Sequence, residues 1–154
     1  MRLLLIGLTG CLLSCSGMPP ASVQPERPID PTPAVLALSD SILAAAGDRD
    51  AERFAAYFSD HPGFRYLINA KQIESPAALR TAFDAMLRRQ QDFRPEWQSR
   101  AVQVLTPEVA VLTGTFSTQA RRVNGDEWTA SGAVTFVALK ELDRWRVVNW
   151  HTSE

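Results

Sequence analysis

Apolar and polar positions alternate most clearly at the end of the chain, in residues 145–153. Tryptophans, valines, an asparagine and a histidine fall there in the pattern of a strand that packs one face and presents the other. Three earlier segments also predict strands, namely residues 99–105, 109–121 and 128–140. The turns between them are short, and Asn124-Gly125 is a strong hairpin signal. Consecutive strands joined in this way pair antiparallel, so the pattern predicts a four-stranded meander.

Apolar residues recur at three- and four-residue spacing before these strands, which is typical of helices that bury one face. The predicted helices are residues 32–47, a shorter helix that starts at Asp48 or Asp50, and residues 76–91. Thr32 and Ser75 each precede a proline and are expected to cap their helices. Residues 64–69 predict a short strand at one side of the sheet.

These elements predict an α+β fold, with a cone-shaped, curved antiparallel sheet covered by three N-terminal helices. The sheet consists of the four-stranded meander plus the early edge strand. A sheet this long must cover one face, and a strongly twisted sheet wrapped on few helices leaves a conical hollow. We therefore expect a pocket between the sheet and the helices.

Composition narrows the class of protein. The chain has 154 residues, of which 45% are hydrophobic and 21% charged, enough for one ordinary core. Its formal net charge of -1 lacks the basic excess of nucleic-acid binders, so no nucleic-acid partner is expected. The sequence has no histidine pair at helical spacing, no cysteine cluster and no glycine-rich phosphate loop. Neither a metal nor a cofactor is therefore expected.

The N-terminus predicts export and does not look like part of the fold. Arg2 precedes an apolar run, residues 3–13, that is shorter than the roughly 20 residues needed to span a bilayer. The Leu-Leu-Ser-Cys sequence ending at Cys15 resembles the lipobox of bacterial lipoproteins, which implies acylation of Cys15. Cys11 fits the same short pattern but leaves a very short apolar core. An ordinary secretory signal is the alternative interpretation.

The chain therefore divides into a signal peptide over residues 1–14, a lipidated cysteine with a proline-rich spacer over residues 15–31, and a folded domain over residues 32–154. The expected location is the bacterial cell envelope, facing the periplasm in a Gram-negative host, with the lipid anchor as the only membrane contact. Both cysteines precede the folded domain, so it can hold neither a disulfide framework nor a thiolate metal site.

The order of the predicted elements and three local features of the folded part resemble the nuclear transport factor 2-like superfamily, and within it the SnoaL-like and DUF4440 type of small bacterial domain. The local features are the Gly47-Asp48 junction between the first two helices, the apolar run over residues 132–137 and the closing segment over residues 145–153. The resemblance covers residues 32–154. It implies a cone with a pocket between sheet and helices, commonly in a homodimer, but it does not specify an activity.

Acidic residues are absent from the interiors of the predicted strands, which argues against isomerase-type catalysis by a carboxylate held in an apolar site. The strands instead carry hydroxyls and amides, which suit a small polar-headed ligand. The candidate ligand-binding residues are Tyr57, Tyr66, Trp97, Thr113, Thr115, Thr129, Ser131, Asn149 and His151.

Two classes of function remain open from the sequence. The favoured one is a cell-envelope lipoprotein whose domain binds a small molecule or assembles without catalysis. The alternative is a SnoaL-like cyclase, isomerase or hydrolase that uses His151 as general base, with Asp40 or Tyr57 as further catalytic candidates. For each of these three residues a purely structural role is also open: a backbone contact for His151, an exposed helix face for Asp40 and a place in the core for Tyr57.

Overall fold

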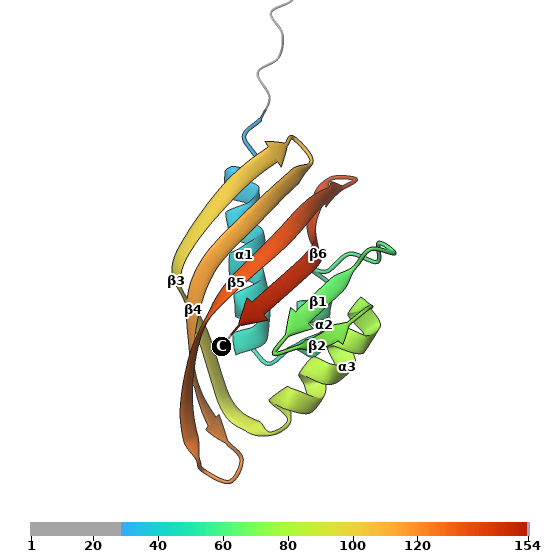
Figure 1. Ribbon diagram of the computed structural model, residues 1–154. Coiled ribbons are helices and arrows are strands. Elements are labelled where there is room, and N and C mark those ends of the chain that lie inside the picture. Colours follow the sequence, from blue (N-terminus) through green and yellow to red (C-terminus); the bar gives the residue numbers. More distant parts are fainter. Residues whose placement is uncertain (1–28, 154) are drawn as a thin grey trace, which may run out of the picture.

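The computed structural model describes residues 29–153, in which helices cover one face of a curved sheet (Figure 1). The predicted signal peptide, both cysteines and most of the predicted spacer lie outside the described residues. The elements in chain order are α1 (Thr32–Gly47), α2 (Ala51–Ala55), β1 (Arg65–Ile68), β2 (Lys71–Ile73), α3 (Pro76–Leu87), β3 (Gln90–Thr106), β4 (Val109–Arg122), β5 (Glu127–Glu141) and β6 (Arg144–Ser153). None of the helices in the described range has the length and apolar character needed to cross a membrane.

The predicted α+β class and the antiparallel meander are confirmed. The six-stranded sheet has the order β2-β1-β6-β5-β4-β3, and β3 to β6 pair as successive antiparallel neighbours. The structure corrects the start of β3, which begins at Gln90 rather than at Ser99, and α3 accordingly ends at Leu87 rather than near Gln91. Pairing with β4 along the whole of β3 overrides the helical spacing that the sequence shows up to Gln91.

The sequence predicted that the early strand, residues 64–69, lies at the edge of the sheet, but in the structure this strand, β1, has a neighbour on each side. β1 pairs in parallel with β6 on one side and antiparallel with β2 on the other, so β2 is the edge strand. Asn69 and Ala70 both have positive φ, 45° and 63°, and this tight turn folds the chain back to form β2. Sequence reasoning missed β2 because alanine is not a residue that signals such a turn.

Side-chain caps set the helix starts. The Ser75 hydroxyl accepts a hydrogen bond from the first turn of α3, as predicted. Between the two candidates for α2, Asp50 and not Asp48 is the cap. Thr32 is wrong as a cap by one residue, because it is already helical and its N–H donates to the Asp30 carboxylate at 3.0 Å. That backbone hydrogen bond holds the pKa of Asp30 below its usual value.

The curvature of the sheet has local causes in β3 and β4. Register shifts interrupt the β3–β4 pairing, one of them between Trp97 and Ser99, and such bulges bend a strand. Opposite this bulge, Gly114 lies so close to β3 that a methyl group there would be 2.5 Å from the carbonyl oxygen of Ser99. Without a side chain at Gly114 the two strands can bend together, and one end of the sheet swings towards α3 (Figure 1).

The core fills the space between the concave face and α1. It contains the apolar face of α1 and the inward-facing positions of β4, β5 and β6, with the largest fully buried side chains at Phe58, Phe64, Phe136, Ile42 and Leu79. After α2 the chain itself docks on β6, because the Ser59 N–H donates to the Val147 carbonyl at 2.8 Å and the Val147 N–H to the Tyr57 carbonyl at 2.9 Å.

Candidate functional site

A cavity of about 780 Å³ lies between the concave face of the sheet and the helices. Its walls come from both layers of the fold, since the helices supply mostly aliphatic side chains together with Phe54 and Phe83, and the strands supply the remaining aromatic ones. The lining residues are Ile42, Leu43, Ala46, Phe54, Tyr66, Ile68, Lys71, Gln72, Ile73, Leu79, Ala82, Phe83, Met86, Phe93, Pro95, Trp97, Phe116, Thr118, Trp128, Trp150 and Thr152. The predicted pocket between sheet and helices is therefore present.

The polar groups of the aromatic wall are already bonded within the protein. The Trp97 indole N–H donates to the Ser39 carbonyl at 3.3 Å, and the Trp128 indole to the Gln90 amide oxygen at 3.1 Å. The Trp150 indole donates to the Thr152 hydroxyl. Among the residues that line the cavity there is no carboxylate. The walls thus offer apolar and aromatic surface and few free hydrogen-bonding groups, which is the usual composition of a pocket for an apolar ligand.

Trp150 anchors this wall through stacked aromatic rings. Its ring is stacked with that of Tyr66 at a centroid distance of 5.8 Å and with that of Phe136 at 5.3 Å, and both pairs are nearly parallel. Such offset stacks hold large rings in fixed positions and contribute beyond their buried area. This part of the wall is therefore preformed.

Tyr66 and Trp97 are the two candidate ligand-binding residues that line the cavity. Tyr57 does not line it. It lies half-buried beyond the end of α2, packed against the core. Its position follows from the docking of the segment after α2 on β6, in which the backbone carbonyl of Tyr57 accepts a hydrogen bond from the Val147 N–H.

The polar candidates on β4, β5 and β6 share one face, as predicted, but it is the outer face of the sheet. Thr113 pairs with Thr135, which in turn pairs with His151, and all three side chains are exposed. Because side chains alternate along a strand, the neighbouring positions, such as Leu112, face the core instead. The candidates on this outer face are Thr113, Thr115, Thr129, Ser131, Asn149 and His151. They do not line the cavity, and a role in binding a ligand stays a prediction.

The three catalytic candidates are not brought together. Asp40 lies on α1 and forms an ion pair with Arg100 of β3, whose guanidinium also donates to the Ser39 hydroxyl at 2.7 Å. His151 is on the opposite side of the sheet and makes no side-chain hydrogen bond or ion pair with any residue of the described chain. Because the sheet separates them, Asp40 and His151 cannot act on one substrate as an acid and base pair.

Several cavity residues were missed by sequence reasoning. Phe116 and Thr118 of β4, Trp128 of β5 and Thr152 of β6 all line it. A usable signal was present in the sequence: the same alternate positions farther along β4 and β5 carry alanine, leucine, valine and phenylalanine, which marks their face as the covered one. In the part of the chain that the structure describes, the face of the sheet that the helices cover is the one that borders the cavity.

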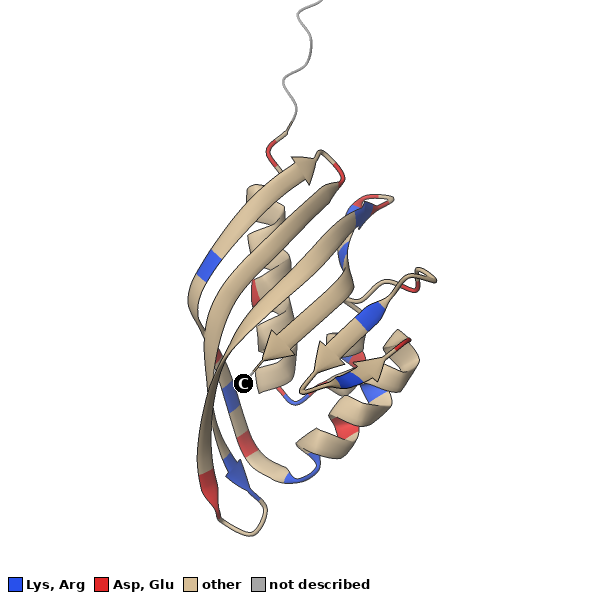
Figure 2. Cartoon of the chain, viewed as in Figure 1, with Lys and Arg blue, Asp and Glu red and all other residues tan. Residues whose placement is uncertain are grey.

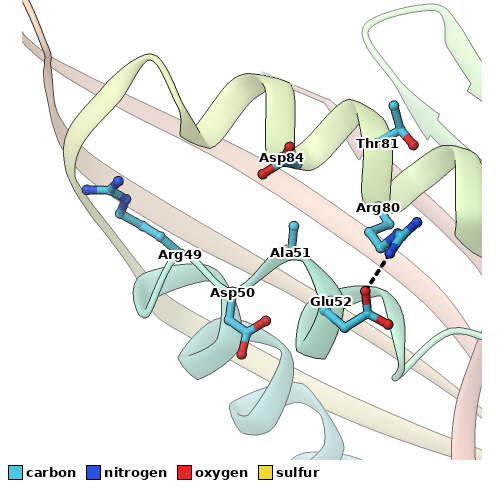
Figure 3. A pocket seen from close by; sticks show the side chains of 7 residues that line it. All are labelled: Arg49, Asp50, Ala51, Glu52, Arg80, Thr81 and Asp84. Carbon is cyan, nitrogen blue, oxygen red and sulfur yellow. Dashed lines mark hydrogen bonds and ion pairs between the residues drawn. The ribbon is translucent and has the colours of Figure 1, made fainter.

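A second hollow, a groove of about 560 Å³ between α2 and α3, is lined mainly by charged side chains (Figure 3). Glu52 and Arg80 form an ion pair across it at 2.6 Å, and this hydrogen bond raises the pKa of Arg80 above its usual value. The Asp50 carboxylate caps α2. These partners already satisfy the carboxylates of Glu52 and Asp50, and solvent-exposed ion pairs of this kind contribute little to stability. The groove is a solvated surface without a free convergent group.

Charge is absent from the middle of the outer face. The stretches 109–120 of β4, 128–139 of β5 and 147–153 of β6 contain no Asp, Glu, Lys or Arg. Figure 2 shows the same feature, with coloured residues along β3 and at turns, strand ends and helices, and tan ribbon along the middle of β4, β5 and β6. A broad uncharged sheet face on a protein with 33 charged residues is unusual for a surface that meets only water.

The six-stranded cone, its helical cover and its cavity define the class of protein, which is the nuclear transport factor 2-like fold. A superfamily protein of that name from Salmonella enterica serovar Typhimurium superposes with a TM-score of 0.71 at 17% identity, covering 77% of this chain and 87% of that one. The chain belongs to the calcium/calmodulin dependent protein kinase II association domain family, whose model matches residues 32–154.

Two further solved structures illustrate the range of proteins on this fold. A Xanthomonas campestris protein assigned to the same association domain has a TM-score of 0.68 at 23% identity, covering 77% of this chain and 84% of that one. A Novosphingobium aromaticivorans protein assigned as a scytalone dehydratase has a TM-score of 0.72 at 9% identity, covering 79% and 81%. These likenesses establish the fold alone. A search among curated proteins found no match, and the DUF4440 assignment stays a prediction.

Proposed function

We propose that this protein is a noncatalytic binding domain, which holds a small apolar molecule in the cavity between sheet and helices. The observation that carries the proposal is the chemistry of the cavity, which has a volume of about 780 Å³ and a largely apolar wall, without a carboxylate and with each indole N–H bonded within the protein. Such a wall favours burial of an apolar ligand and offers no carboxylate base for proton abstraction.

The test places a larger side chain in the cavity. Ala82 lies on α3 and lines the cavity, so Ala82→Phe should fill part of the binding space. We expect binding of the neutral fluorescent probe phenylnaphthylamine to weaken by about tenfold or more, equivalent to roughly 1.4 kcal/mol. The measurement is energy transfer from tryptophan to probe, which suits a cavity lined by Trp97, Trp128 and Trp150.

The matched control is Ala85→Phe, on the same helix. Ala85 is exposed and is not among the lining residues, so probe affinity should remain within about twofold of the parent, inside roughly 0.5 kcal/mol. Equal weakening by both variants, or no probe binding by the parent protein, would contradict a binding function for the cavity.

The proposal includes assembly with a second copy of the chain through the outer face of the sheet. Its support is the uncharged middle of that face, since depletion of charged residues is what distinguishes the core of a protein interface. The family name, association domain, belongs to proteins that are similar to this one in sequence. A homodimer is the simplest symmetric assembly that covers the face.

We further propose that the domain is tethered to the bacterial cell envelope by acylation of Cys15, facing the periplasm in a Gram-negative host. The support is the apolar run over residues 3–13, the lipobox-like sequence that ends at Cys15 and the proline-rich segment that follows. Incorporation of labelled palmitate that persists in Cys11→Ser and is lost in Cys15→Ser is the measurement that decides between the two cysteines.

The alternative function is a SnoaL-like enzyme that uses His151 as general base. It is favoured only by the fold, which also occurs in a hexachlorocyclohexane dehydrochlorinase and in a protein assigned as a scytalone dehydratase. Because the exposed His151 has no carboxylate partner in the described chain, we expect His151→Ala to change stability by no more than about 0.5 kcal/mol and to leave probe binding intact. If a candidate substrate is found to be turned over, loss of turnover in the folded variant would favour the enzyme instead.

A further inference from the structure

One charged side chain, Lys71, lines the otherwise uncharged cavity. It is the first residue of edge strand β2, opposite Ile68 of β1, and is exposed to solvent. The positive-φ turn at Asn69 and Ala70 determines this position, because it brings the chain back along β1 beside the cavity. Lys71 therefore lies where the apolar space meets water.

The ammonium group of Lys71 has no ion-pair or hydrogen-bond partner among residues 29–153. The nearest acid along the chain, Glu74, accepts a hydrogen bond from the Gln72 amide at 2.8 Å. Seven ion pairs occupy arginines elsewhere in this part of the protein, so an unpaired cation on a cavity wall is a distinct feature. No lining carboxylate is present to repel an anion.

We propose that the cavity takes an apolar anion, with its aromatic or acyl body against the Trp97 and Trp150 wall and its acidic group on the Lys71 ammonium. This inference rests on the proposed binding function and specifies the class of ligand. An aromatic wall with its own hydrogen bonds satisfied attracts the apolar body, and a lone cation at the rim selects the head group. A neutral ligand would leave Lys71 without a role, and a cationic one would be repelled by it.

Because Lys71 lies where the cavity meets solvent, its expected contribution to ligand affinity is modest. A solvent-exposed ion pair contributes up to about 1 kcal/mol, so the head group should raise affinity by about fivefold over a neutral molecule with the same body. Salt screens exposed charges, with a Debye length of about 10 Å at 0.1 M and about 3 Å at 1 M, so the preference should shrink at high salt. Affinity for the neutral molecule should not fall with it.

Two fluorescent probes form a matched pair for the test on the full chain. Phenylnaphthylamine is neutral, and anilinonaphthalene sulfonate has the same aromatic body with one anionic group. We expect the anion to bind about fivefold tighter to the parent protein, and the preference to disappear in Lys71→Met, which keeps a long apolar stem. Lys71→Arg should retain it, which separates charge from a structural role.

The sequence provides a matched control because it contains only two lysines, Lys71 and Lys140. Lys140 is exposed near the far end of β5 and does not line the cavity, so Lys140→Met should keep the full preference for the anion. The bound anion should also protect Lys71, and not Lys140, from acylation by a lysine-reactive reagent followed by mass spectrometry.

The outcomes separate this inference from the function on which it rests. Equal affinity for both probes, or a preference that survives in Lys71→Met, would overturn the assignment of the head group while leaving the binding function in place. If neither probe binds the parent protein, both the head-group assignment and the proposed binding function would be removed. Circular dichroism of Lys71→Met should match that of the parent, because the substituted side chain is exposed and unpaired in the described chain.

Discussion

Replacing Phe58 by alanine should lower the free energy of unfolding by about 3–5 kcal/mol, the range for removing a fully buried aromatic side chain. The side chain is 1% exposed and its ring is the centre of an aromatic cluster. Its ring neighbours are Phe54, Phe64, Tyr66 and Trp150, at centroid distances of 5.2, 6.0, 5.8 and 5.9 Å. Removal therefore leaves a void on which four rings border, and rigid rings cannot collapse into it easily.

The variant should also weaken probe binding, because two of those neighbours, Tyr66 and Trp150, form part of the cavity wall. Urea unfolding followed by circular dichroism measures the loss of stability. Leu142→Ala is the control, since Leu142 is 97% exposed and its truncation should change stability by less than about 0.5 kcal/mol. If the free energy of unfolding of Phe58→Ala is within about 1 kcal/mol of that of the parent, the aromatic cluster is not the centre of the core.

Thr115→Arg should separate the proposed dimer, raising its dissociation constant by at least about 100-fold, or roughly 2.7 kcal/mol. Thr115 lies in the uncharged middle of the outer face, where its hydroxyl is 2.8 Å from that of Ser99 on β3 and its strand neighbour on β5 is Ala133. In a two-fold symmetric dimer both copies carry the substituted arginine in the interface, so two guanidinium groups would be buried without partners. Burying an unpaired charge costs several kcal/mol.

Sedimentation velocity over a range of protein concentrations measures this effect. The control is Thr81→Arg, which adds the same charge at an exposed threonine of α3, on the helical side of the protein. We expect it to leave the dimer intact and Thr115→Arg to sediment as a monomer. A parent protein that is monomeric at every concentration, or a Thr115→Arg protein that still dimerises, would remove the outer face as the interface.

Local signals in the sequence predicted most of the elements correctly. Ser75 caps α3 because a serine hydroxyl before Pro76 can reach an N–H of the first helical turn, whatever the rest of the chain does. Asn124 and Gly125 end a strand because glycine accepts a positive φ, here 93°, although the turn they belong to is longer than two residues. Such features depend on neighbours within a few positions.

The incorrect predictions concern strands that depend on contacts with segments distant in the chain. β2 was missed because its residues gain strand structure only by pairing with β1, and the β1–β6 pairing is parallel between segments about eighty positions apart. The start of β3 was placed too late because the bulges that bend it become visible only against β4. Neither pairing partner can be read from the segment itself.

The candidate site shows the same division. Alternation along β4, β5 and β6 correctly predicted that Thr113, Thr115, Thr129, Ser131, Asn149 and His151 share a face, because a strand has a period of two. The structure does not place these polar side chains beside the cavity, so their role in binding a ligand stays a prediction. The hollow lies on the other face, among Phe116, Trp128 and Trp150.

By itself, the sequence determined the α+β class, the antiparallel order of the last four strands, the caps of α2 and α3 to within one choice, and which strand residues lie on one side together. These depend on backbone geometry and on residues close in the chain. Only the tertiary structure decided that β2 forms an edge of the sheet, that Asp40 and His151 lie on opposite sides of it, and that Lys71 lines the cavity. Those outcomes depend on contacts between segments that are distant in the chain, above all the pairing of β1 with β6, which places β2 at the edge of the sheet and Lys71 beside the cavity.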